Sequence, residues 1–77
     1  MKIRYDKSVD AVYISLVASR DSRYSGFTYS CDPSMVNGQI NLKFDISDRL
    51  IGIEILQASK KLPPELLAIA EIVEYPS

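Results

Sequence analysis

Apolar and polar residues alternate along several short segments of the chain, which is the pattern of β-strands with one buried face. Polar turns separate these segments: residues 6–10 lie between the first two, and Ser47-Asp48 joins the two arms of a hairpin. The pattern predicts an α+β domain with an antiparallel sheet of four to five strands, arranged as a hairpin-rich meander. The predicted strands are Lys2–Asp6, Ala11–Leu16, Tyr24–Cys31, Ile40–Ile46 and Leu50–Leu56.

The register of these strands follows from one requirement. The apolar side chains of two paired strands must lie on the same face, because a slip of one residue would turn every side chain to the other face. The residue pairs that satisfy this requirement are Ile3 with Ile14, Tyr5 with Val12, Ile40 with Ile55, Leu42 with Ile53 and Phe44 with Ile51.

A helix is predicted after the last strand. Pro64 suits a first helical position, and Pro76 ends the helix. An apolar stripe with helical spacing, formed by Leu66, Ile69, Ala70 and Val73, packs the helix on one face of the sheet. Between the third and fourth strands, Asp32-Pro33 and Asn37-Gly38 delimit a connection that contains one short helical turn. The predicted core is Ile14, Leu42, Phe44, Ile53, Ile55, Leu66 and Ile69.

The length of 77 residues allows one domain, residues 1–77. A core of this size rarely supplies more than about 3–5 kcal/mol, so small domains usually need an additional stabilising device. Cys31 is the only cysteine and histidine is absent, which argues against an internal disulfide and a structural zinc site. Close packing and self-association therefore remain as the stabilising devices.

Charge and hydropathy indicate a cytoplasmic protein without a membrane partner. The formal net charge is −1, and no apolar run approaches the length of a membrane span. In this setting we expect Cys31 to be a reduced, partly buried thiol. Basic and aromatic residues do alternate in one segment, as on nucleic-acid platforms, but two arginines neutralise few phosphates. That segment contains Arg20, Arg23, Tyr24, Phe27 and Tyr29, and we rank a nucleic-acid partner below a protein partner.

Candidate chemistry is sparse. Without histidine, a Ser-His or Cys-His nucleophile cannot form. Carboxylates flank the two tight turns, where aspartate commonly accepts local backbone hydrogen bonds, so we assign Asp6, Asp10, Asp45 and Asp48 to turns. Glu54 points away from the apolar face and is predicted to pair with Lys43 or another basic side chain across the sheet. We therefore predict no enzymatic activity, no catalytic residues, no cofactor and no metal site.

The apolar residues exceed what one core can bury. A single helix covers only one face of a sheet, and the other face carries apolar as well as charged side chains. This surplus predicts a homodimer or higher oligomer, most simply with two-fold symmetry. The competing explanation is that the Ser19–Gly38 connection folds back over the second face. The candidate interface residues are Tyr13, Leu50, Leu56, Leu67 and Ile72.

Two sequence blocks resemble a small bacterial family catalogued as domain of unknown function 2283. The first block is Ile3-Arg4-Tyr5-Asp6 with Asp10-Ala11-Val12-Tyr13-Ile14 and Leu16. The second is Ile40-Asn41-Leu42-Lys43-Phe44-Asp45 with Arg49-Leu50-Ile51-Gly52-Ile53-Glu54-Ile55-Leu56 and Ala58-Ser59. The family usually has Asp-Gly where this chain has Ser47-Asp48. The resemblance implies a small antiparallel-sheet domain, often encoded beside small toxin-like proteins, without established catalytic residues.

The leading hypothesis is therefore a non-catalytic protein-interaction domain that associates with itself. An antitoxin-like role toward a small toxin is one form this interaction would take. A small-ligand or nucleic-acid-binding module is the second hypothesis, and a carboxylate-based enzyme is the third.

Overall fold

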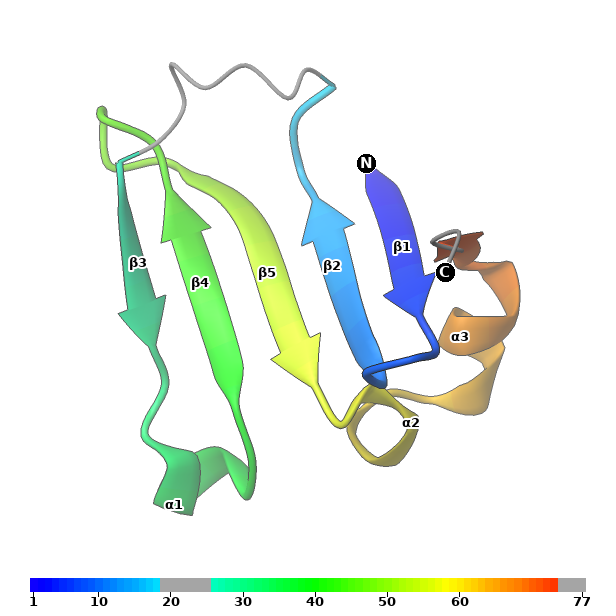
Figure 1. Ribbon diagram of the computed structural model, residues 1–77. Coiled ribbons are helices and arrows are strands. Elements are labelled where there is room, and N and C mark those ends of the chain that lie inside the picture. Colours follow the sequence, from blue (N-terminus) through cyan, green and yellow to red (C-terminus); the bar gives the residue numbers. More distant parts are fainter. Residues whose placement is uncertain (19–25, 74–77) are drawn as a thin grey trace.

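The computed structural model describes residues 1–18 and 26–73, without the side chain of residue 73 (Figure 1). These residues form an α+β fold with one six-stranded sheet and three short helices. The strands are β1 (Lys2–Asp6), β2 (Ala11–Ser15), β3 (Phe27–Ser30), β4 (Ile40–Phe44), β5 (Leu50–Leu56) and β6 (Glu71–Val73). The helices are α1 (Pro33–Val36), α2 (Ala58–Lys61) and α3 (Pro64–Ile69).

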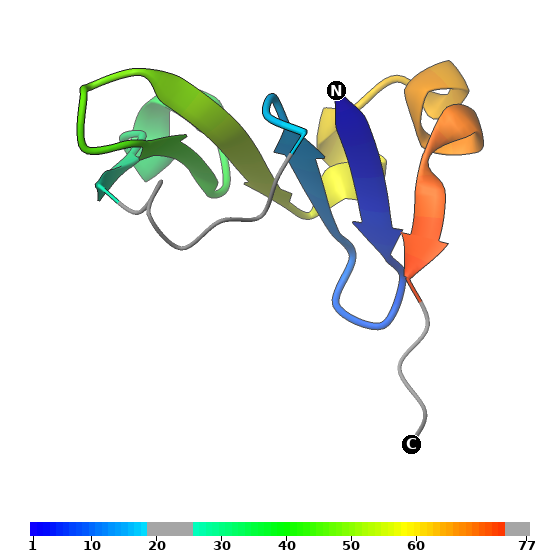
Figure 2. The same ribbon diagram turned by 90° about the horizontal axis from the view of Figure 1, so that it is seen from above.

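The strand order across the sheet is β3-β4-β5-β2-β1-β6. Four of the strand pairs are antiparallel, as predicted, but β6 pairs with β1 in the parallel direction. The prediction of an all-antiparallel sheet of four to five strands is therefore wrong in strand number and in this one pair. The sheet is strongly twisted, so β3 and β6 at its two edges point in different directions (Figure 2).

The predicted register holds for four of the five residue pairs. Ile3 lies opposite Ile14, Tyr5 opposite Val12, Ile40 opposite Ile55 and Leu42 opposite Ile53. A β-bulge then shifts the register, so that Phe44 faces Leu50 rather than Ile51.

The hairpin turn explains this shift. Asp45 and Arg49 close a three-residue loop, in which the Asp45 N–H donates to the Arg49 carbonyl oxygen at 2.9 Å. The predicted two-residue turn is therefore wrong. Asp48 has φ 64°, a left-handed conformation that aspartate tolerates better than most residues, so it takes the place of the usual glycine. The extra loop residue requires the bulge.

The C-terminal segment departs most from prediction. Pro64 occupies a first-turn position of α3, as expected, but the helix ends at Ile69 and Ala70 is extended. Residues 71–73 form β6 against the otherwise open edge of β1. The consecutive β-branched residues Ile72 and Val73 favour a strand. The predicted helix to residue 75 is therefore wrong, and α2 is a helix that the periodicity did not predict.

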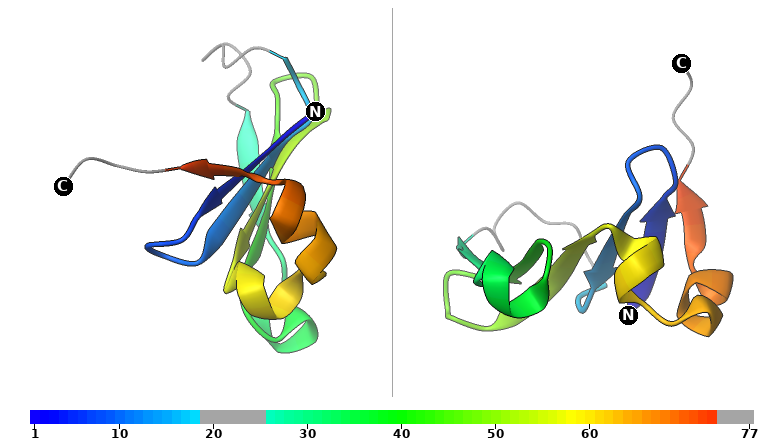
Figure 3. Two further views of the ribbon diagram at one scale, coloured as in Figure 1. Left: turned by 90° about the vertical axis from the view of Figure 1, so that its right-hand side faces the viewer. Right: turned by 90° about the horizontal axis from the view of Figure 1, so that it is seen from below.

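The buried apolar core of the described residues is small: Val12, Ile55 and Ala58. Of the predicted core residues, Ile55 is buried, whereas Ile14 and Ile53 are partly buried and pack against this core. Leu62 and Leu67 contribute from the helical region. Ile69 was predicted to be buried but is 74% exposed, because the short α3 turns Leu67 rather than Ile69 toward the sheet. Leu42, Phe44 and Leu66 are only partly buried. Figure 3 shows α2 and α3 together on one side of the sheet, away from β3 and β4.

The connection between β2 and β4 extends the sheet. Its described part, residues 26–38, adds β3 beside β4, followed by the predicted helical turn α1. The Asp32 side chain caps α1 by accepting the Ser34 N–H at 3.0 Å. In this part of the chain, the connection lengthens the apolar face instead of covering the second face.

Candidate functional site

The apolar face of the sheet continues beyond the helices onto β3 and β4. Residues directly opposite each other on paired strands share a face. Tyr29 lies opposite Leu42 and Phe27 opposite Phe44, and β5 continues both rows. Phe27 and Tyr29 are 51% and 55% exposed. We call the five residues of this region the aromatic patch: Phe27, Tyr29, Leu42, Phe44 and Leu50.

The aromatic patch is ordered by its own packing. The rings of Phe27 and Phe44 stack with centroids 4.7 Å apart and an interplanar angle of 10°. Aromatic pairs of this kind contribute about 0.5–1.5 kcal/mol beyond their buried area. None of the patch residues is charged, and the nearby Lys43 points to the other face, where its Nζ donates to Thr28 Oγ1 at 3.3 Å. The patch is therefore a preformed, uncharged surface.

The opposite face of the sheet carries a polar row. Arg4, Tyr13, Glu54 and Asn41 lie side by side on β1, β2, β5 and β4. Asn41 is only 6% exposed, and its Nδ2 donates to Glu54 Oε1 at 2.7 Å. Glu54 therefore pairs with Asn41, its direct cross-strand neighbour, and the predicted pairing with Lys43 is wrong.

Tyr13, a predicted interface residue, is held over this polar face. Its ring lies against Gly52, where an added methyl group would collide with the phenol. Partial burial, and then the charge of Glu54, raise the pKa of the Tyr13 hydroxyl above its ordinary value. The absence of a side chain at Gly52 allows this close approach.

The structure does not bring the five predicted interface residues together. Leu50 and Ile72 are partly exposed on the apolar face, but they belong to β5 and to the far edge strand β6. Tyr13 and Leu56 lie on the polar face. Leu67 packs against the core. Phe27 and Tyr29 are exposed aromatic residues that this prediction did not include, because their alternation in a strand is also the pattern of core residues.

The carboxylates mostly serve turns. Asp6 Oδ1 accepts the Ser8 N–H at 3.0 Å. The buried Asp45 accepts the N–H groups of Ser47 and Arg49, and Arg49 Nε donates to its second oxygen at 2.9 Å. The Arg49 N–H is the main reason why the pKa of Asp45 lies below its ordinary value. Among residues 1–18 and 26–73, no three potential metal-ligating side chains cluster.

Asp10 has a longer-range role that the sequence analysis missed. With φ 52°, it ends the β1–β2 turn and accepts hydrogen bonds from Tyr5 Oη at 2.8 Å and from Ser59 Oγ at 2.7 Å. The Ser59 hydroxyl, followed by that of Tyr5, lowers the pKa of Asp10. Gln57, the residue before α2, was the available signal for this role. Glutamine is a poor helix N-cap, so the first N–H groups of α2 need a hydrogen-bond acceptor from elsewhere in the chain.

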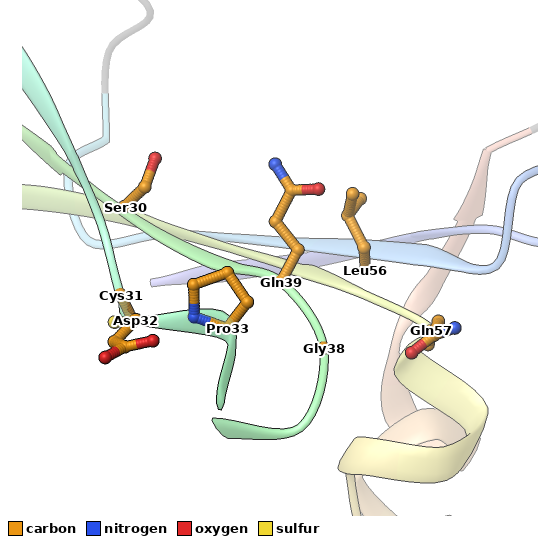
Figure 4. A pocket seen from close by; sticks show the side chains of 8 residues that line it. All are labelled: Ser30, Cys31, Asp32, Pro33, Gly38, Gln39, Leu56 and Gln57. Atoms are coloured by element: carbon orange, nitrogen blue, oxygen red, sulfur yellow. The ribbon is translucent and has the colours of Figure 1, made fainter. Parts of the chain in front are cut away.

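An open cavity of about 520 Å³ lies where β3 and β5 end and β4 begins. Figure 4 shows Ser30, Gln39 and Leu56 projecting on one side, with Pro33 beside them. The partly buried thiol of Cys31 also lines this cavity, in agreement with its predicted partial burial. The lining residues are Ser30, Cys31, Asp32, Pro33, Gly38, Gln39, Leu56 and Gln57.

The segment in which basic and aromatic residues alternate is only partly described. Arg20, Arg23 and Tyr24 lie outside the described residues, whereas Phe27 and Tyr29 belong to the aromatic patch. No helix in the described ranges is long and apolar enough to cross a membrane.

Comparisons with known proteins gave one match. No curated protein and no solved structure matched the chain significantly. The sequence model of a family described as "Protein of unknown function (DUF2283)" matches residues 2–59. This range contains β1 to β5 and the Asp10–Ser59 contact, and it ends before α3 and β6. Because the match covers most of the chain, the protein belongs to the DUF2283 family.

Proposed function

We propose that this protein is a non-catalytic protein-interaction domain that associates with itself through the aromatic patch. The observation that supports this most directly is the exposure of Phe27 and Tyr29, each about half exposed, on an apolar face that the described helices leave open. Tyrosine and phenylalanine in such positions are typical of the apolar centre of protein interfaces. The patch residues are also uncharged, and charged residues are depleted from the centres of protein interfaces.

The small core supports the same proposal. Only Val12, Ile55 and Ala58 are buried apolar residues in the described part of the chain. A domain with so few buried apolar side chains gains little from its own packing, and association is a common way to stabilise it. A second copy that covers the aromatic patch would add buried area where the monomer has least.

A small toxin-like protein is the second polypeptide partner that we propose, in keeping with the gene neighbourhood that the family resemblance implies. Its binding to the same patch would compete with self-association. Titration of the purified neighbour protein into this one, followed by sedimentation, would show a heterodimer forming at the expense of the homodimer.

Sedimentation equilibrium at micromolar concentration tests self-association. We expect a dimer mass for the natural chain and at least tenfold weaker association for Tyr29→Ser, because one of the two exposed aromatic residues of the patch is lost. Ile69→Ser is the matched control, since Ile69 is also highly exposed but lies on α3, outside the patch. A monomer mass for the natural chain, or equal weakening by both variants, would refute the proposal.

Nucleic-acid binding is the alternative use of the same residues. Exposed aromatic rings can stack on unpaired bases, and Phe27 and Tyr29 are placed for this. Fluorescence anisotropy with a 20-nucleotide oligothymidylate, at 50 and 200 mM salt, distinguishes the two roles. Micromolar binding that weakens with salt and is lost in Tyr29→Ser would favour the nucleic-acid role.

A further inference from the structure

Strand β3 has an open edge whose backbone groups can be assigned. The Cys31 N–H donates to the Ile40 carbonyl oxygen of β4 at 2.9 Å. Backbone groups alternate in direction along an antiparallel strand, so Phe27 and Tyr29 also bond toward β4. The N–H and C=O groups of Thr28 and Ser30 consequently point outward. No described strand pairs with them, because β3 is the last strand of the sheet.

The two edges of the sheet differ in chemistry. In the described residues, the β6 edge has three residues and carries Glu71, whose carboxylate pairs with Lys2 Nζ at 3.5 Å. Charges and short strands are the usual protection against edge-to-edge pairing. Strand β3 reads Phe-Thr-Tyr-Ser and has neither a charge, a proline nor a bulge, and three of its residues favour strands. Among the described strands, β3 is therefore the unprotected edge of the sheet.

We propose that β3 strands of two copies pair in the antiparallel direction about a two-fold axis, with Thr28 of each copy opposite Ser30 of the other. This pairing rests on the proposed self-association and specifies its geometry. It satisfies the outward groups of both residues in both copies, and it joins the two aromatic patches on one side of a continuous sheet. Tyr29 then lies on the axis, directly opposite Tyr29 of the second copy.

Other registers are less favourable. A shift by one residue would place the apolar face of one copy beside the polar face of the other. A further shift would set Ser30 opposite Gly26, whose N–H already donates to the Phe44 carbonyl oxygen at 2.9 Å. The occupant is a second copy, because β3 is uncharged and the net charge of −1 gives little repulsion between two chains.

Disulfide trapping tests this register. Tyr29→Cys in a Cys31→Ser background places two thiols opposite each other in a closely spaced, non-hydrogen-bonded pair, which a disulfide can bridge. Because Tyr29→Cys removes the same ring as Tyr29→Ser and should weaken the dimer, mild oxidation is carried out at a concentration at which the reduced variant still sediments as a dimer. We expect it to give a covalent dimer on a non-reducing gel. Thr28→Cys in the same background is the control, because its side chain lies on the other face and faces Ser30. We expect at least tenfold less cross-linking from it.

Sedimentation of the reduced Cys31→Ser protein separates the two proposals. Two outcomes would overturn β3 pairing but leave self-association standing. In the first, the reduced protein is a dimer but Tyr29→Cys gives no cross-link; in the second, both cysteine variants cross-link equally. A monomer overturns both. Thr28→Pro adds a test without cysteines: it removes an outward N–H but no bond to β4, so we expect a monomer that keeps its far-ultraviolet circular dichroism spectrum. A dimer of unchanged affinity would overturn β3 pairing.

Discussion

The Asp10 carboxylate accepts two hydrogen bonds from Ser59, one from its backbone N–H at 3.0 Å and one from its hydroxyl at 2.7 Å. The two residues are 49 positions apart in the chain. Asp10 thereby supplies the N-terminal cap that α2 lacks, since Gln57 makes no side-chain cap. The Ala58 N–H also donates to the Asp10 carbonyl oxygen at 2.8 Å, so the β1–β2 turn is attached to the start of α2.

This attachment predicts acid sensitivity. The pKa of Asp10 is lowered in the folded state, so its stabilising effect is complete well above the unfolded value of about 3.9. It is lost as the pH falls from that value through the folded-state pKa. We expect Asp10→Asn to lower the melting temperature at pH 7. The difference from the natural chain should shrink below about pH 4. Asparagine keeps the left-handed backbone accessible, so the substitution tests the carboxylate.

Asp32→Asn is a suitable control for Asp10→Asn. The pKa of Asp32 is also lowered, by the Ser34 hydroxyl first, but Asp32 caps only the short helix α1. We expect a smaller loss of melting temperature than for Asp10→Asn. Equal losses would show that the long-range attachment to Ser59 adds nothing to a local cap.

Strand pairing was largely predictable from sequence because alternation carries the necessary information. In the first hairpin, the pairing of Tyr5 with Val12 follows from the requirement that apolar side chains share a face. The same requirement gave the wrong partner for Phe44. The buried Asp45 carboxylate organises a wider turn, and the bulge compensates for the extra turn residue. Such a turn depends on specific hydrogen bonds to the Asp45 side chain, which periodicity does not report.

The C-terminal segment was not predictable because its sequence supports two structures. Leu66, Ile69 and Val73 have helical spacing, yet residues 71–73 gain more as a strand beside β1. That gain depends on an open edge, a property of the sheet and not of the segment. The aromatic patch was missed for the same reason. Phe27 and Tyr29 alternate like core residues, and only the strand order shows that β3 lies beyond the helices.

Leu67 and Ile69 give a direct test of the α3 orientation. Leu67 packs against the core, whereas Ile69 is 74% exposed. We expect Leu67→Ala to lower the free energy of unfolding by about 1–3 kcal/mol, in line with the partial burial of a leucine side chain. Ile69→Ala should change it by about 0.5 kcal/mol or less. Urea denaturation of both variants measures this difference, and the reverse order would mean that α3 presents its other side to the sheet.

Divalent cations should not stabilise the protein. Asp6 and Asp45 direct their oxygens to local backbone N–H groups, and Asp10 directs its oxygens to Tyr5 and Ser59. We therefore expect calcium, magnesium and manganese at low millimolar concentration to leave the melting temperature unchanged. A substantial increase would reveal preferential binding to the folded state and contradict the assignment of these carboxylates to hydrogen bonds.

Gly52→Ala should destabilise the protein through Tyr13. A methyl group at position 52 would collide with the Tyr13 phenol, and the ring must move away from position 52 to make room. Overpacking of this kind typically costs about 1–3 kcal/mol. Urea denaturation of Gly52→Ala, Tyr13→Ala and the double variant forms a thermodynamic cycle. We expect Gly52→Ala to cost much less in the Tyr13→Ala background, because the colliding ring is absent. An equal cost in both backgrounds would place the strain in the β5 backbone and would contradict the close packing of Tyr13 on Gly52.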